Sequence, residues 1–384
     1  MKKILFVLQT LRSGGSVTSM LNLLSFLKER GVQADIFLLQ REGVFLKRAE
    51  SITKVLPEER IISSVLCPRH ELKNRGVVAE LIRVWFVLCC KMLGTSKAIE
   101  LFYKASARTL SGKYDVVVAY QESLTTEYTQ YIKASKKIAW VHNDYCRFAG
   151  KKLVKQEQKL YDSYNEIVCV SQASRKSMTE NLNISANHIH VIYNTIPKES
   201  IVQQSEEKIE PLIKRKFTFI SMGRFVEQKG FDRAVEVAFR LKKNNIDFIW
   251  YIIGNGVDFE QIEMKIINKQ VEEHLILLGL RTNPFPYIKQ ADCFIMTSRY
   301  EAQPMVLNEA LTLGIPVIST RFSSAIEVID DGVNGLIVDN SEEGVYQGIK
   351  VYINDETLRK KISSGAKKFM YDNEKIINQV INLL

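Results

Sequence analysis

The chain has 384 residues, of which 46% are hydrophobic and 25% are charged, an ordinary composition for a soluble globular protein that excludes extended disorder. Because this length exceeds what a single hydrophobic core usually supports, we expect two domains. The formal net charge of +10 favours anionic partners such as phosphorylated ligands, acidic lipid surfaces or nucleic acid. The basic residues are spread along the chain and no nucleic-acid motif accompanies them, so nucleic acid is not an expected partner.

Six cysteines occur without any C-x-x-C pair, and several lie in apolar, strand-like runs: Cys67, Cys89, Cys90, Cys146, Cys169 and Cys293. We expect them to be reduced core residues of a cytoplasmic protein. Metal ligation is the alternative, but the five histidines are not spaced with these cysteines, and no metal ligands are assigned. The apolar run Ile4–Leu8 is too short for a signal peptide and is predicted to be the first strand.

A glycine-rich loop follows this strand and precedes an apolar-periodic segment at residues 20–27, which predicts a strand, a loop and a helix. Gly14 and Gly15 in the loop would let a phosphate or a sugar approach the backbone at the helix start. A tight connection that binds no ligand explains the same loop. The G-x-G-x-x-G fingerprint is missing, so a dinucleotide-dependent dehydrogenase is not expected.

Further apolar runs in the first half predict buried parallel strands at residues 32–39, 116–120, 138–141 and 167–170. His142 directly follows one of them, at the carboxyl end where open α/β sheets bind ligands. A purely structural histidine is the alternative. Ser171 is predicted to cap a helix that starts at Gln172.

Residues 72–110 have a helical pattern that includes a strongly apolar run at residues 81–93. This run is far shorter than the roughly 20 residues needed to span a bilayer. We interpret it as a helix buried in the core. The alternative is a hydrophobic element with basic edges that rests on a membrane surface.

The polar, charged residues 198–216 are the predicted linker between two domains. Strand and helix patterns alternate again beyond it, with strands expected at residues 217–222, 248–253, 275–278, 293–296, 317–319 and 336–338. Repeated strand–helix units on both sides of the linker predict two doubly wound parallel-sheet domains. The last segment, residues 356–384, has a helical pattern and no strand.

Residues 300–314 read as the loop after a buried strand followed by a helix from about Pro304 to Leu313. Glu301 lies in the loop and Glu309 on the helix, on either side of amides predicted to be free. Two carboxylates around an anion-binding helix start suit a nucleotide sugar, which has hydroxyls at both ends and phosphate in the middle. Alternatively, Glu301 caps the helix and Glu309 is solvated.

Two cations, Arg224 and Lys229, share the loop after the first strand of the second half. A guanidinium fork and a mobile ammonium group in one loop suit a diphosphate. A solvated loop with incidental cations is the alternative.

These motifs together, in this order, resemble the retaining glycosyltransferases of family 4: the glycine pair, the His-Asn-Asp of residues 142–144, the loop 223–230, the Gly-Asn-Gly of residues 254–256 and the stretch 298–318. The resemblance implies the α/β GT-B fold, two Rossmann-like doubly wound parallel-sheet domains that face a cleft. Residues 1–200 would bind the acceptor and residues 201–365 the nucleotide-sugar donor. Residues 366–384 would form a helical segment that packs back toward the N-terminal domain.

The resemblance also implies roles for the candidate residues. Arg224 and Lys229 match the cations that hold the diphosphate, so neither a metal ion nor another cofactor is expected. Glu301 matches the glutamate that holds the donor sugar, Glu309 matches the one that binds the ribose, and His142 would lie beside the sugar. The remaining expected donor contacts are Gly14, Gly15, Gly254, Gly256, Leu280, Arg281, Pro304, Met305, Val306 and Leu307. Many family members carry Gly or Ser where this chain has Ala302 and Gln303.

A family member would transfer a sugar from a UDP- or GDP-sugar to a saccharide or lipid-linked acceptor in bacterial capsule or other surface polysaccharide synthesis. It would act in the cytoplasm, with peripheral contact to the inner face of the membrane. A soluble sugar synthase, a nucleotide-sugar epimerase on the same fold and a catalytically silent partner in a glycosyltransferase complex are the alternatives. The sequence makes no prediction of the oligomeric state.

Overall fold

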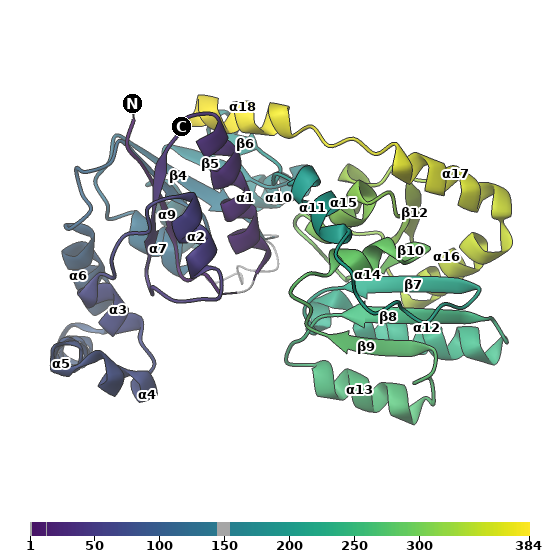
Figure 1. Cartoon of the computed structure of the whole chain (residues 1–384). Helices are drawn as coiled ribbons and strands as arrows, with labels where there is room; N and C mark the ends of the chain where they lie inside the picture. Colours follow the sequence, from purple (N-terminus) through teal and green to yellow (C-terminus); the bar gives the residue numbers. More distant parts are fainter. Residues whose placement is uncertain (1, 13, 144–153) are drawn as a thin grey trace. The chain divides into compact units, whose positions relative to one another are not determined.

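The computed structural model describes residues 2–12, 14–143 and 154–384, and the chain forms two compact units. Unit 1 contains residues 1–195 together with 373–384, and unit 2 contains residues 196–372 (Figure 1). Cys146 lies outside the described residues. The other five cysteines are free thiols, and all but Cys90 are buried.

Unit 1 is built on a six-stranded parallel sheet in the order β2-β1-β3-β4-β5-β6. Its strands are β1 (Ile4–Leu8), β2 (Ala34–Leu38), β3 (Val116–Ala119), β4 (Lys136–Val141), β5 (Glu166–Cys169) and β6 (Ile189–Val191). Its helices are α1 (Gly15–Glu29), α2 (Leu46–Ile52), α3 (Arg60–Leu66), α4 (Arg69–Leu72), α5 (Val77–Leu93), α6 (Thr95–Ala107), α7 (Leu124–Thr129), α9 (Val154–Tyr161), α10 (Gln172–Asn181) and α18 (Asn373–Leu383). Short 3₁₀ turns span Lys73–Arg75 and Ala186–His188.

Unit 2 has a second six-stranded parallel sheet, in the order β12-β11-β10-β7-β8-β9. Its strands are β7 (Phe217–Met222), β8 (Phe248–Ile253), β9 (Leu275–Gly279), β10 (Cys293–Met296), β11 (Val317–Thr320) and β12 (Gly335–Val338). Its helices are α11 (Lys198–Ser205), α12 (Phe231–Lys243), α13 (Phe259–Asn268), α14 (Phe285–Lys289), α15 (Met305–Thr312), α16 (Glu342–Asn354) and α17 (Glu356–Lys367), with 3₁₀ turns at Glu227–Lys229 and Ala325–Glu327.

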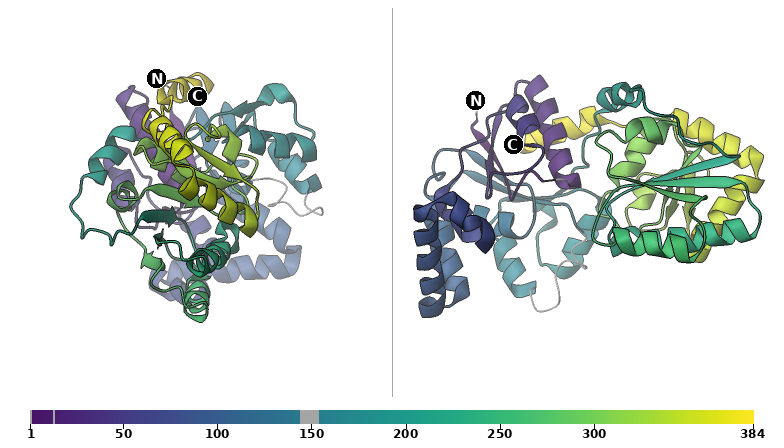
Figure 2. Two further views of the ribbon diagram at one scale, coloured as in Figure 1. Left: turned by 90° about the vertical axis from the view of Figure 1, so that its right-hand side faces the viewer. Right: turned by 60° about the horizontal axis from the view of Figure 1, so that its bottom comes forward.

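Helices cover both faces of the second sheet, which explains why its strands are continuous apolar runs (Figure 2). In β7, the neighbours Phe219 and Ile220 point to opposite faces and belong to two separate hydrophobic clusters. The predicted fold class, two doubly wound parallel-sheet domains, is therefore confirmed.

The strand orders define where each sheet can bind a ligand. In unit 2 the first strand, β7, lies between β8 and β10, so the strand order is that of a dinucleotide-binding Rossmann sheet. In unit 1 the corresponding reversal lies between β1 and β3. Open α/β sheets bind ligands outside the carboxyl ends of the strands at such a reversal. The loops after β1, β3, β7 and β10 are therefore the candidate binding loops.

The expected linker is partly wrong. Residues 198–205 form helix α11, which packs on α14 and α15 and so belongs to unit 2. Ile201, which is buried, anchors this otherwise polar helix. The units divide at Thr195 and Ile196, whereas the sequence suggested residue 200.

The interpretation of residues 81–93 as a buried core helix is also wrong. One face of α5 packs against α3 and α6. Its other face exposes large apolar side chains to solvent. None of the helices in the described part of the chain is long and apolar enough to cross a membrane.

The C-terminal helix α18 is part of unit 1, where it contacts α1. It buries Ile376, Ile377 and Val380. The Lys136 ammonium group donates a hydrogen bond of 2.6 Å to the carbonyl of Leu383. Unit 1 therefore contains both ends of the chain.

Candidate functional site

Lys229 and Glu301 meet at the strand reversal of unit 2. Lys229 ends the loop after β7, Glu301 follows β10, and the Lys229 Nζ lies 2.6 Å from Glu301 Oε1. Both side chains are largely buried, at 15% and 10% exposed. The sequence predicted that the two residues contact one ligand, and the structure shows that they also contact each other.

Several polar groups fix the position of the Glu301 carboxylate. Ser298 donates to the same Oε1 at 2.9 Å, and the Gln228 amide lies 3.4 Å from Oε2. Gln228 also donates to the carbonyl of Tyr300, and Ser324 donates to the carbonyl of Glu301 itself, both at 2.9 Å. Because Oε2 has only this long contact, it keeps hydrogen-bonding capacity for a ligand hydroxyl.

Arg224 lies in the same loop as Lys229 but is exposed. Among the described residues, no carboxylate lies within ion-pair distance of its guanidinium group. Its charge is therefore uncompensated locally, in contrast to that of Lys229.

Gly254 and Gly256 hold the loop after β7 against the loop after β8. A Cβ atom on Gly254 would lie 1.9 Å from the carbonyl oxygen of Gly223, and one on Gly256 would lie 2.4 Å from that of Phe225. The amide of Phe225 donates to the carbonyl of Asn255 at 2.9 Å. These two glycines therefore permit the close backbone approach that positions Arg224.

A hollow of about 420 Å³ opens beside these glycines, lined by Asn255, Gly256, Val257, Phe259, Glu260 and Gly279. Leu280 and Arg281, two of the expected donor contacts, directly follow Gly279. Leu280 is exposed, and the guanidinium group of Arg281 lies 5.5 Å from the ring centre of Tyr287.

The start of α15 differs in part from the prediction. Pro304 occupies the N-cap position, and no side chain caps the helix, so Glu301 is not its cap. The amides of Met305 and Leu307 already donate to the carbonyls of Gln303 and Pro304, at 3.0 and 3.1 Å. The amide of Val306 has no acceptor in the described part of the chain, and it remains available for an anion.

Glu309 lies on α15 and is partly buried. Burial raises the pKa of its carboxyl group to about 7, although the nearby Lys229 charge lowers it. The alternative of a solvated Glu309 is therefore wrong. When this carboxyl group is ionised, its burial lowers the stability of the folded protein.

In unit 1, α1 begins at Gly15 without a side-chain cap, directly after Gly14. Neither glycine has a positive φ in the range that excludes other residues, and a Cβ atom on either would meet nothing within 4 Å. The space at this helix start is open, which fits both an approaching ligand and a loop without one.

Gln121 and Glu122, in the loop after β3, connect the expected site residues of unit 1. The Gln121 side chain donates to Ser16 Oγ at 2.8 Å, and its carbonyl oxygen accepts from the amide of Gln9 at 3.3 Å. The Glu122 carboxylate accepts hydrogen bonds from the backbone amides of His142 and Asn143, at 2.6 and 2.7 Å. Three loops at the carboxyl edge of this sheet are thereby tied together.

The imidazole of His142 is neutral at physiological pH because burial lowers its pKa to about 3. Its ring centre lies 4.8 Å from that of Tyr120, and its Nε2 atom is buried without a hydrogen-bond partner among the described residues. A buried nitrogen without a partner is costly, so it marks a place where a ligand group can bind.

Sequence reasoning missed Gln121 and Glu122, and with them Ser298 and Gln228. The signal was present for Glu122, because it follows β3 at the carboxyl end, the same rule that selected His142. In residues 2–12, 14–143 and 154–384, no group of three His, Cys, Asp or Glu side chains could hold a metal ion.

Comparison with known proteins identifies both halves of the chain. The family model "Glycosyltransferase Family 4" matches residues 13–200, and the model "Glycosyl transferases group 1" matches residues 202–369.

Among curated relatives, N-acetylgalactosamine-N,N'-diacetylbacillosaminyl-diphospho-undecaprenol 4-alpha-N-acetylgalactosaminyltransferase of Campylobacter jejuni is 29% identical over 251 residues. The match covers 64% of this chain and 66% of that protein. Lipopolysaccharide 1,6-galactosyltransferase of Salmonella typhimurium is 29% identical over 49% of this chain and 50% of its own. The chain thus spans between half and two thirds of these relatives.

Two solved structures share the fold over the full length. HepE of Anabaena in complex with UDP-glucose has a TM-score of 0.73 at 17% identity, covering 100% of both chains. TarM has a TM-score of 0.76 at 15% identity, covering 100% of this chain and 98% of its own. With family models over both halves and this shared GT-B fold, the chain belongs to family 4 of the glycosyltransferases.

Proposed function

We propose that the protein is a retaining glycosyltransferase that moves a sugar from a UDP-sugar to a lipid-linked saccharide acceptor, without a bound metal ion. The observation that carries this proposal is the contact between Lys229 and Glu301, with Arg224 in the same loop, at the strand reversal of unit 2. This arrangement offers cations for a diphosphate and a carboxylate for sugar hydroxyls at one edge of one sheet.

The cations would hold the diphosphate. An ammonium group has three N–H donors, and Glu301 takes one from Lys229, so two remain for phosphate oxygens. Arg224 adds an uncompensated guanidinium fork, and the Val306 amide adds a helix start. Departure of the nucleotide builds negative charge on the diphosphate, which these fixed groups stabilise more in the transition state than in the ground state.

The carboxylates would hold the two ends of the donor. Glu301 can accept from hydroxyls of the sugar through Oε2, which has only the long contact with Gln228. Glu309 can bind the ribose hydroxyls. In the ionised state it would accept from both hydroxyls, and the positive charge of Lys229 favours that state.

Retention needs no protein nucleophile in this scheme. The bond from the anomeric carbon to the diphosphate oxygen breaks, and the acceptor oxygen bonds to that carbon on the face that the diphosphate leaves. The acceptor proton passes to the departing phosphate. A neutral His142 near the sugar would not repel the positive charge that develops at the anomeric carbon.

The relatives support the choice of donor and acceptor. HepE was crystallised with UDP-glucose, and the name of the Campylobacter jejuni protein states an acceptor linked through diphosphate to undecaprenol. A relative in Rhizobium meliloti is named for lipopolysaccharide core biosynthesis. These names support the proposal that this chain acts in surface polysaccharide assembly. We further propose that it acts at the cytoplasmic face of the membrane.

The test is release of UDP from a panel of UDP-sugars, with and without a lipid-linked saccharide extract. We expect release that depends on the acceptor and is unchanged by EDTA, with the new linkage in the donor's anomeric configuration by NMR. Loss of activity in EDTA would contradict metal independence. Interconversion of sugars without any acceptor would show an epimerase instead.

A further inference from the structure

Helix α5 presents a stripe of large apolar side chains to solvent. Leu81, Trp85 and Leu88 are 63%, 58% and 44% exposed, and their spacing of four and three residues puts them on one face. Val77, Val78, Val84 and Met92 lie on the same side of the helix and are also exposed, and Leu93 is exposed at its end. A contiguous apolar surface of this kind marks an interaction site.

The opposite face of α5 is already used. Ile82, Phe86 and Cys89 pack in a small cluster with residues of α3 and α6. In Figure 1, α5 lies beyond α3 and α6 on the side away from the sheet of unit 1. The exposed stripe therefore has no apolar neighbour within the described part of its own unit.

Helix α6, which packs along α5, adds a row of cations. Lys97, Leu101, Lys104 and Arg108 are exposed and spaced by four, three and four residues, so they share one face of the helix. Lys104 pairs with Glu100 at 2.5 Å. Among the described residues, no carboxylate lies within ion-pair distance of Lys97 or Arg108.

The basic row continues into a hollow of about 650 Å³ at the end of α6. Four cations line it, Lys104, Arg108, Lys133 and Lys137, and none of the lining residues is acidic. This hollow is large enough for a phosphate headgroup.

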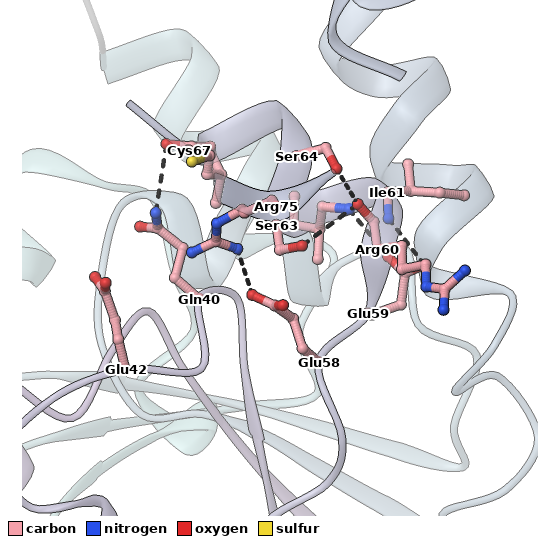
Figure 3. Close-up of polar contacts among 12 residues, drawn as sticks. Gln40, Glu42, Glu58, Glu59, Arg60, Ile61, Ser63, Ser64, Cys67 and Arg75 are labelled. Atoms are coloured by element: carbon pink, nitrogen blue, oxygen red, sulfur yellow. Dashed lines mark hydrogen bonds and ion pairs between the residues drawn. The ribbon is translucent and has the colours of Figure 1, made fainter. Parts of the chain in front are cut away.

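Figure 3 shows that two nearby carboxylates, those of Glu58 and Glu59, have partners within the described part of unit 1. Glu58 pairs with Arg75, and Glu59 accepts from the amides of Ile61 and Ile62 at the start of α3. Gln40, which follows β2, donates to the carbonyl of Leu66. The Gln40 contact ties the end of α3 to the loop after β2. Residues 58–108 contain nine Lys and Arg against five Glu, so this segment carries a net positive charge.

We propose that the exposed stripe of α5 and the cations of α6 dock the protein on a bilayer that carries anionic phosphate headgroups. Apolar side chains would enter the interface while the lysine and arginine side chains contact the headgroups. The charge argues against a second copy as the occupant. In a two-fold dimer the same patch meets itself, so the cations beside the stripe would repel each other.

This inference goes beyond sugar transfer, and its test needs neither donor nor acceptor. The full chain is sedimented with phosphatidylglycerol vesicles and with phosphatidylcholine vesicles at low salt. We expect at least tenfold stronger binding to phosphatidylglycerol, and weakening as salt is raised. W85S/L88S and, separately, K97Q/R108Q should each lower the affinity at least tenfold.

Matched controls lie in unit 2. M264S/I267S removes apolar side chains of similar exposure, 58% and 54%, and K243Q/K361Q removes two exposed cations. Neither control should change binding. The proposal is overturned if the wild type fails to bind phosphatidylglycerol, or if both apolar pairs weaken binding equally. It is also overturned if the wild type forms a dimer that W85S/L88S dissociates.

Discussion

At the scale of single residues, the Lys229–Glu301 contact has the least exposed side chains of the ion pairs among the described residues. Removing one partner of a fully buried pair costs about 3–5 kcal/mol, because the other charge stays buried without compensation. Because the Lys229–Glu301 pair is still partly exposed, we expect removal of one partner to reduce the free energy of unfolding by less than this. Structural and catalytic roles therefore have to be separated by experiment.

We expect K229A and E301A each to abolish transfer and to lower the melting temperature modestly. The double variant K229M/E301Q should recover the melting temperature, because no unpaired charge remains, and it should stay inactive because the donor contacts are missing. Calorimetry and UDP release measure the two effects. K269A, which breaks the 2.7 Å pair with Glu236 in the same unit, should remain active. Near-normal turnover in either single variant would refute the proposed roles.

Glu309 predicts a dependence of stability on pH. The pKa of its carboxyl group in the folded protein, about 7, lies above the ordinary value of 4.5. The free energy of unfolding of the wild type therefore falls as the pH rises between these two values. The side chain in E309Q has no titratable proton. The free energy of unfolding of E309Q minus that of the wild type should therefore increase from pH 5 to pH 8, by on the order of 2–3 kcal/mol. Urea unfolding at both pH values measures this difference. An unchanged difference would contradict the raised pKa, and unchanged UDP affinity in E309Q would contradict its role.

At the scale of elements, the glycines separate into two kinds. The loop after β7 lies so close to Gly256 that no Cβ atom fits there. A Cβ atom on Gly15 would meet no other atom within 4 Å. We expect G256A to lower the melting temperature because its Cβ atom would overlap Phe225. G15A should leave the melting temperature unchanged and lower the affinity for a UDP-sugar, since a ligand would approach there. Equal effects of both substitutions on stability would contradict this distinction.

Strands were the most predictable elements, because strands buried on both faces are continuous apolar runs. Residues 217–222 were predicted as a strand and form β7 with the same bounds. For helices, the sequence predicted less well which neighbouring elements pack against each face. The apolar pattern of α5 indicates a helix, but it does not say what covers each face, and the polar pattern of α11 concealed a helix held mainly by Ile201.

The candidate site was predictable in its residue types but not in its contacts. Strand ends located Lys229, Glu301 and His142, because ligand-binding loops follow the strands. The direct contact of Lys229 with Glu301 depends on loop conformations that no periodicity encodes. Glu122 was missed because its role, accepting the His142 and Asn143 amides, involves backbone groups rather than a motif.

At the scale of the whole molecule, the last helix completes the first unit. Residues 373–384 bury Ile376, Ile377, Val380, Leu383 and Leu384, and Arg30 pairs with Glu374. A fully buried side chain of this kind contributes about 1.5–3 kcal/mol, and a domain is stable by only about 5–15 kcal/mol.

Deleting residues 373–384 should therefore remove or strongly lower the unfolding transition of unit 1, while that of unit 2 persists. Differential scanning calorimetry of the full chain and the truncated chain measures both transitions. I377D should act in the same direction, and N378A, at an exposed position of the same helix, should act as wild type. A truncated chain with both transitions unchanged would show that α18 is dispensable.

In the proposed function, unit 2 binds a nucleotide diphosphate through Arg224 and Lys229. Titration calorimetry of UDP and of uridine, with the wild type and with R224A and K229A, measures whether these two cations bind the diphosphate. We predict that each substitution weakens UDP binding at least tenfold and changes uridine binding little, because only the diphosphate contacts the cations. Equal weakening of UDP and uridine binding, or UDP binding as tight as in the wild type, would contradict the proposed role of these cations.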